Sequence, residues 1–235
     1  NHTVIRILGR YGIPEVQFLA FPPRVRGEVQ VESGHFWADE PCGVAAAPFT
    51  SETAEIRLFS RYGGLRTVLK PDVPGPYSMA AGAFLGSSEL LAVAPMRPAG
   101  ATVRVVLFDG GGAEVRRLQV DVPGAEPAPG DVSLLARTVP DGVVLLLHRT
   151  GAPMARALDC RTGRATGVPL GGIPTTAGLY ASAFGNTQLL AAGPEPELSH
   201  IYRLDDAPQT TPLDVGTREN CFWYAASGAH AGEDS

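Results

Sequence analysis

The sequence contains little lysine, no clustered positive charge and no long apolar run. Its 19 basic residues include a single lysine, Lys70, and they are scattered along a chain whose net charge is −5. Nucleic-acid binding needs a basic stripe and a high pI, so the composition excludes this class of partner. No window of 18 apolar residues is present, which excludes a transmembrane helix of its own. The preference for arginine over lysine is typical of a GC-rich bacterial genome.

Cysteine is also scarce. Cys42, Cys160 and Cys221 are an odd number, without the paired spacing of a zinc site. A disulfide between Cys42 and Cys221 stays open as an alternative, but we expect all three to be small buried apolar residues. The histidine pairs of zinc enzymes and the Asp-rich loop of calcium sites are missing too, so we expect no metal and no cofactor.

Helical periodicity is missing, and a long repeat takes its place. The 21 prolines among 235 residues leave few windows for a helix of about ten residues. Ile5–Gly12 returns 51 residues later as Ile56–Gly63, with five of eight positions identical. Weaker copies follow at Val105–Gly110, Ala155–Asp159 and Ile201–Asp206, at intervals of 46 to 51 residues. A repeat of this length indicates a small supersecondary unit that buries its apolar face against its neighbours.

Each copy consists of four short apolar segments separated by turn residues. In the third copy we expect strands at Ala80–Leu85, Glu89–Ala94, Thr102–Phe108 and Val115–Val120, because Gly, Pro and Asp punctuate the intervals. Four antiparallel strands per copy are typical of a β-propeller blade, and a β-sandwich is the alternative. The strands expected in the fourth and fifth copies are Val132–Ala136, Val143–Leu147, Ala155–Leu158, Ala165–Leu170, Leu179–Phe184, Gln188–Ala192, His200–Leu204 and Thr211–Val215.

The two ends of the chain are expected to complete one blade together. Thr3–Leu8 matches the third strand of later copies, and Asn220–Ala225 resembles a first strand, so their pairing would leave no open sheet edge. Phe36-Trp37 is the expected first strand of the second copy. The sequence therefore predicts an all-β chain, with residues 1–235 forming one β-propeller of five four-stranded blades. A six-bladed alternative takes Glu28–Glu32 as an extra strand.

Candidate catalytic residues are few. The second blade contains three such residues close together in the sequence: His35, Asp39 and Glu40. A carboxylate pair near a histidine could serve acid–base chemistry or hold a metal. The interpretation we favour is an Asp-Glu-Pro turn after a strand, with His35 at the strand end. No Gly-x-Ser-x-Gly motif is present, and Gly110–Gly112 leads into a strand, which predicts a hairpin turn. We expect no catalytic residues and no enzymatic activity.

Arginine and aromatic residues recur at equivalent turns. Arg10-Tyr11 and Arg61-Tyr62 occupy the same place in two copies and are expected on one face of the protein. Paired cations and aromatic rings suit a protein interface. The alternative interpretation is a hairpin turn whose polar ends are solvated. The aromatic pairs Phe36-Trp37 and Phe222-Trp223 form a second candidate set. The predicted interface residues are Arg10, Tyr11, Arg61, Tyr62, His35, Trp37, Trp223 and Tyr224.

One stretch has a recognisable order of strand and turn residues. From Ile5 to Val31 the chain contains Ile-Arg-Ile-Leu-Gly-Arg-Tyr-Gly, then Phe-Pro-Pro-Arg-Val, then Gly-Glu-Val-Gln-Val. A strand that ends in a Gly turn, followed by a Pro step into the next unit, resembles the NHL-like and TolB-like propeller repeats of bacteria. This resemblance implies a propeller used for binding, and it transfers no catalytic residue. The Trp-Asp dipeptide of WD40 repeats and the Asp-box of sialidases are missing.

The function that we favour from the sequence is a non-catalytic module for protein–protein interaction or scaffolding. It includes the role of an extrinsic subunit that reaches a membrane-bound complex through a partner. One alternative is a carbohydrate- or small-ligand-binding propeller, and another is a propeller hydrolase or lyase that uses His35, Asp39 and Glu40. The start at Asn1, without an initiator methionine, favours processing and a periplasmic or secreted location.

Overall fold

The structure, a computed structural model, describes residues 4–8, 13–23, 25, 29–49, 55–86, 88–122 and 130–169. It also describes the backbone of four later strands, at 178–181, 188–192, 200–203 and 212–213. All of these strands pair in antiparallel sheets, and the described residues contain no helix. It follows that this part of the chain has no helix able to cross a membrane. The predicted all-β class is confirmed.

The strands form one two-stranded sheet and four four-stranded sheets, each in sequence order. The two-stranded sheet contains β1 (Val4–Leu8) and β2 (Pro14–Leu19). The second sheet contains β3 (Val29–Gly34), β4 (Gly43–Pro48), β5 (Ile56–Ser60) and β6 (Leu65–Leu69). The remaining three comprise β7 (Tyr77–Gly82), β8 (Leu90–Pro95), β9 (Thr102–Phe108), β10 (Glu114–Asp121), β11 (Val132–Val139), β12 (Gly142–Arg149), β13 (Met154–Asp159), β14 (Arg164–Pro169), β15 (Gly178–Ala181), β16 (Gln188–Ala192), β17 (His200–Arg203) and β18 (Pro212–Leu213).

The third sheet contains the four predicted strands; β8 and β10 differ from their predicted bounds by one residue at each end, and β7 differs most. Strand β9 has the predicted bounds, but β7 begins at Tyr77, three residues before the expected start at Ala80. The extra residues belong to the sheet because Tyr77 pairs with Pro95 of β8. The hydroxyl of Ser78 accepts the Leu134 N–H of the neighbouring sheet at 2.9 Å. The strand also ends at Gly82, before the predicted Leu85, so it is displaced by three residues toward this contact with the neighbouring sheet.

The second sheet corrects one prediction. Phe36-Trp37 is not its first strand; Val29–Gly34 is, as β3, and it pairs with β4 along its whole length. The segment Glu28–Glu32, which the six-bladed alternative takes as an extra strand, overlaps this first strand and so adds no further strand among the described residues. Trp37 makes only an isolated bridge to Glu40, within the connection between β3 and β4. The alternation in β3 places Val29 and Val31 on one face, in the apolar cluster of Ile5 and Phe59, and Gln30 and Glu32 on the opposite face.

Three sheets share an irregularity at the same place. The register shifts between Ile7 and Leu8, between Leu58 and Phe59, and again opposite Leu107 and Phe108. Each shift leaves one extra residue on the following strand, namely Glu15, Arg66 and Val115. These residues are 51 and 49 positions apart, the spacing of the sequence repeat. The octapeptide therefore marks structurally equivalent strands, each paired to a bulged partner.

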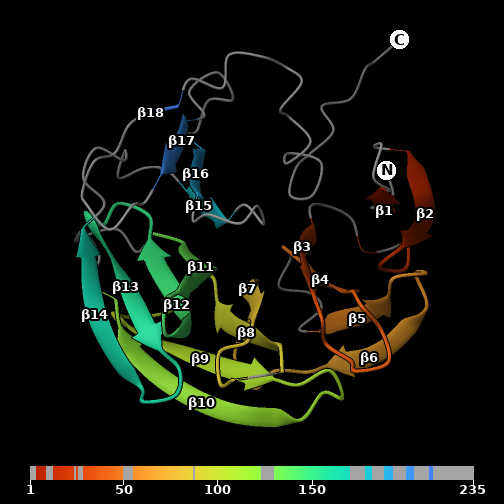
Figure 1. Ribbon diagram of the computed structural model, residues 1–235, viewed down its shortest axis with the longest axis horizontal. Helices are drawn as coiled ribbons and strands as arrows, with labels where there is room; N and C mark the ends of the chain where they lie inside the picture. The colour runs from red at the N-terminus through yellow and green to blue at the C-terminus, as the bar shows by residue number, and fades with distance from the viewer. Residues whose placement is uncertain are drawn as a thin grey trace.

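The sheets are arranged around a common centre (Figure 1). Strands β3, β7, β11 and β15 lie nearest the centre, and neighbouring members of this set pack against one another. Apolar side chains fill the space between adjacent sheets. Ile5 packs with Phe59 between the first two sheets, Leu58 with Leu91 between the next two, and Leu107 with Leu145 between the third and fourth. The first four sheets thus bury apolar side chains against their neighbours, as expected for a repeat protein.

Candidate interaction site

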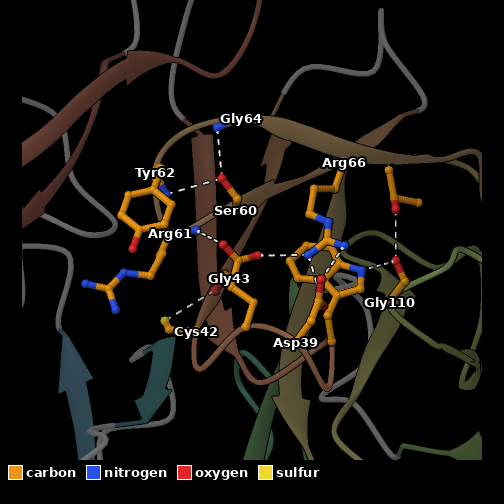
Figure 2. A network of polar contacts seen from close by, with 12 residues as sticks. Asp39, Cys42, Gly43, Ser60, Arg61, Tyr62, Gly64, Arg66 and Gly110 are labelled. Carbon is orange, nitrogen blue, oxygen red and sulfur yellow. Dashed lines mark hydrogen bonds and ion pairs between the residues drawn. The ribbon is translucent and has the colours of Figure 1, made fainter.

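Arg66 is the bulged residue of β6, and its position organises a polar network. A bulge changes the direction of a side chain relative to the regular alternation of the strand. The Arg66 guanidinium donates to both carboxylate oxygens of Asp39, each at 3.2 Å, and to Glu40 Oε2 at 3.2 Å. It also stacks 4.6 Å from the centre of the Trp37 ring. Figure 2 shows Arg66 directed at Asp39, across the connection that follows β3.

The two carboxylates of this network have different surroundings. Asp39 is exposed, whereas Glu40 is buried with 8% of its surface accessible. The hydrogen bond from Arg66 holds the pKa of Asp39 below its usual value, and the same contact raises the pKa of Arg66. Glu40 uses its other oxygen to accept the backbone N–H of Arg61 at 3.2 Å. Both carboxylates are therefore occupied by contacts inside the protein.

Trp37 joins this network to the next sheet. Its indole nitrogen donates to the carbonyl oxygen of Gly110 at 2.8 Å, in the turn between β9 and β10. The hydroxyl of Thr67, on β6, donates to the same oxygen at 2.8 Å. Figure 2 shows Gly110 beside the cluster, although it lies far from Trp37 in the sequence. The predicted interface residue Trp37 is half-buried and has a structural role between two sheets.

The Arg61-Tyr62 turn is the most exposed part of the cluster. Ser60 Oγ accepts the backbone N–H of Tyr62 at 3.2 Å and that of Gly64 at 3.1 Å. Gly63 has a φ of +81°, and a Cβ there would press against the ring of Phe18 on β2. The Tyr62 side chain is 70% exposed, and the Arg61 guanidinium lies 5.0 Å from its ring centre. An exposed tyrosine thus stands beside a half-buried arginine on a closely held turn.

Equivalent turns follow β9 and β13. Asp109 Oδ1 accepts the N–H of Ala113 at 2.9 Å, and Asp159 Oδ1 accepts that of Arg161 at 2.8 Å. Each turn again has a glycine with positive φ, Gly112 and Gly163. The side-chain cap and the glycine recur in these two turns, whereas the Arg-Tyr pair does not; in the sequence it repeats at Arg10-Tyr11.

The other predicted residues have separate positions. His35 is exposed, and its backbone N–H donates to the Glu89 carboxylate. Within the described residues no polar contact joins the His35 imidazole to Asp39 or Glu40, and no group of three metal-binding side chains occurs there. Cys160 is buried as expected, but Cys42 is exposed, because it follows Pro41 in the connection before β4. Arg10, Tyr11, Trp223, Tyr224 and Cys221 lie outside the described residues.

Sequence analysis missed Arg66, Gln30 and Glu32. No pattern in the sequence marks Arg66 as a functional residue. It is equivalent to Glu15 and Val115 because all three are bulged, and a bulge is visible only in the pairing register of the strands. Gln30 and Glu32 did have a signal, the alternation of valine with polar residues from Val29 to Glu32. They were overlooked because this segment was set aside as an extra strand.

A shallow cavity of about 340 Å³ lies apart from this network. Its walls come from the third sheet and from the link that precedes it. The polar residues Thr102, Arg104 and Gln119 line one part, and the rest is largely proline. This cavity is where the alternative of small-ligand binding would be tested.

Comparisons with known proteins identify a fold and no family. No family model matches the chain, and no curated protein matches it significantly. Ten chains among solved structures match. One of them is a protein of unknown function from Bacteroides caccae, 13% identical, with a TM-score of 0.55 over 90% of this chain and 69% of that one. At this identity the chain is similar to that protein in fold alone.

Proposed function

We propose that this chain is a non-catalytic β-propeller that serves as a protein–protein interaction or scaffold module. The observation that supports this function best is the Arg61-Tyr62 turn. It exposes the Tyr62 ring beside the guanidinium of the half-buried Arg61, on a turn held by Ser60, Glu40 and Phe18. Tyrosine and arginine are the side chains that most often supply binding energy at protein interfaces.

The rigidity of the turn favours binding. A side chain that is already ordered in the free protein loses less conformational entropy when a partner covers it. The backbone N–H groups of Arg61, Tyr62, Gly63 and Gly64 all have acceptors within the protein. A partner would therefore meet a preformed surface, and we assign Tyr62 as its principal contact.

The contacts of Asp39 and Glu40 argue against the hydrolase or lyase alternative. A general base must be free to reach a proton of the substrate. Here Arg66 binds both carboxylates, and Glu40 is buried as well. The same network instead positions the turn that presents Tyr62, through the bond from Arg61 to Glu40.

We also propose that the sheets close into a ring of five blades. Strands β1 and β2 correspond to β5 and β6, the third and fourth strands of the second sheet, so two inner strands are needed to complete their sheet. Within the described chain, β1 pairs on one side only. Val4, Leu8 and Leu19 are 38%, 39% and 46% exposed on the face opposite the packed Ile5. Addition of Asn220–Ala225 beside β1 would cover this edge; a six-bladed ring remains the alternative.

An affinity experiment tests the proposed function. The native protein and a Tyr62→Ala variant are immobilised and exposed to an extract of the source organism, with a Val115→Ala variant as control. Val115 is also exposed, but it lies on β10 in another sheet. We expect a partner that binds the native protein and the control and is lost from Tyr62→Ala. Equal capture by all three proteins would exclude this turn as the contact.

A further inference from the structure

Gln30 and Glu32 project from the same face of β3, toward the inner strand of the next sheet. The amide nitrogen of Gln30 donates to the carbonyl oxygen of Met79, on β7, at 3.1 Å. It also lies 3.4 Å from Glu32 Oε1. Farther along this face is Gly34, where a Cβ would stand 2.9 Å from that of Ala81. The polar pair therefore sits where two sheets approach closely.

The orientation of the Gln30 amide follows from its neighbour. A main-chain carbonyl only accepts hydrogen bonds, so the nitrogen of the amide must face Met79 and the oxygen must face away. That oxygen, Gln30 Oε1, is buried and has no donor in the described structure. A buried carbonyl without a donor is costly, and such atoms are rare in folded proteins. A proton donor close to Gln30 would remove this cost.

Glu32 is the neighbouring group that could supply the proton. Glu32 is half-buried, and its partial removal from water raises its pKa to about 8; the hydrogen bond from Gln30 only partly opposes this shift. Strand β4 has no ionisable side chain, and β7 has only Tyr77, whose hydroxyl donates to the Val73 carbonyl. Beyond them lie Glu89 and His35 at the Gly34 end, and Arg137 on β11, which packs against β7.

We propose that Gln30 and Glu32 form an acid–amide pair that fastens β3 to β7 while Glu32 is protonated. The Gln30 amide donates its N–H to Glu32 Oε1, and the carboxyl O–H donates to Gln30 Oε1, so each group gives one hydrogen bond and accepts one. Loss of the proton leaves Gln30 Oε1 without a donor and places a negative charge between the sheets. The pair is thus a pH-sensitive clamp between two inner strands.

The sign of the pH dependence follows from the two states. In the unfolded chain Glu32 titrates near the usual value of 4.5, and in the folded protein near 8. Between these values the folded protein binds about one proton more than the unfolded chain, so stability falls as the pH rises through this window. Above this window Glu32 is ionised in both states, so it no longer makes stability depend on pH.

Calorimetric unfolding between pH 5 and about 9 tests the clamp. We expect the native protein to lose stability across this range and to release about one proton on unfolding near pH 6.5. In Glu32→Gln, whose side chain stays neutral, that loss and that proton should disappear. Glu15→Gln, which changes an exposed glutamate of β2, is the control and should behave as the native protein. An unchanged slope in Glu32→Gln overturns the proposal.

A second measurement needs no variant. The side-chain carboxyl carbon of Glu32 can be followed by NMR in the native protein labelled with ¹³C-glutamate. A midpoint well above neutral pH supports the clamp. A midpoint near the ordinary value for glutamate overturns it, because the proton that the pair requires would then be absent at neutral pH.

Discussion

The indole nitrogen of Trp37 donates a 2.8 Å hydrogen bond to the carbonyl oxygen of Gly110, 73 residues farther along the chain. Trp37 belongs to the connection after the first strand of one sheet, and Gly110 to the last turn of the next. The bond therefore holds two sheets in a definite relative position. Arg66 stacks on the Trp37 ring and binds Asp39, which links this junction to the Tyr62 turn through Glu40.

Substitution of Gly110 should loosen this junction. A Cβ at Gly110 would collide with the carbonyl oxygen of Phe36 and crowd the indole nitrogen of Trp37. We expect Gly110→Ala to lower the free energy of unfolding by about 1–3 kcal/mol, as overpacking does elsewhere. Chemical denaturation measures the loss. Gly100→Ala is a matched control because nothing lies within 4 Å of its Cβ position, and a similar loss there would contradict the explanation.

The depressed pKa of Asp39 should depend on Arg66. In Arg66→Gln the cation that stabilises the carboxylate is gone, so we expect the pKa of Asp39 to rise toward its usual 3.8. NMR titration of the carboxyl carbon measures the change. In the native protein the contribution of the pair to stability is present above this value and is lost as the pH falls through the lower folded pKa. Arg97→Gln removes a different surface pair, with Asp131, and should leave the titration of Asp39 unchanged.

The double variant Asp39→Asn, Glu40→Gln separates structure from catalysis. Both replacements keep the size of the side chain while they remove the charge. We expect the variant to retain its partner and to match the native protein in a broad hydrolase screen. An activity in the native protein that the variant lacks would favour the hydrolase or lyase alternative over the interaction module.

Loss of Tyr62, alone or together with Tyr11, should weaken the proposed complex. Tyr62 stands on a turn fixed by backbone contacts, so truncation of its ring should not disturb folding. We expect Tyr62→Ala, alone or with Tyr11→Ala, to lower affinity by on the order of 1–2 kcal/mol for each true contact. Titration calorimetry with the isolated partner measures this change. Full affinity in a correctly folded double variant would show that another face is used.

Removal of Asn220–Ala226 tests the proposed ring. If this segment completes the sheet of β1 and β2, its loss leaves the edge of β1 unpaired and opens the apolar core of the ring at this sheet. We expect the truncated chain to unfold at lower temperature and to aggregate. A monodisperse truncated protein with unchanged thermal stability would mean that the ring does not close through this segment.

Much of the strand pattern could be predicted because local signals suffice for it. The turns after β5, β9 and β13 need a residue that caps backbone N–H groups and a glycine with positive φ, and both recur in the sequence. The first strand of the second sheet was misplaced because Phe36-Trp37 has the apolar character of a strand. Its actual role depends on Gly110, which no local pattern could indicate.

By itself, the sequence determined the all-β class, the repeat and its four-strand unit, since apolar alternation and turn residues act within a few positions of one another. The tertiary structure decided which side chains meet. Arg66 reaches Asp39 and Glu40 because of a bulge in the pairing register, and Gln30 reaches Met79 because two sheets pack together. Register and packing depend on contacts between distant segments, and so do the direction of a side chain and the pKa of a buried carboxyl.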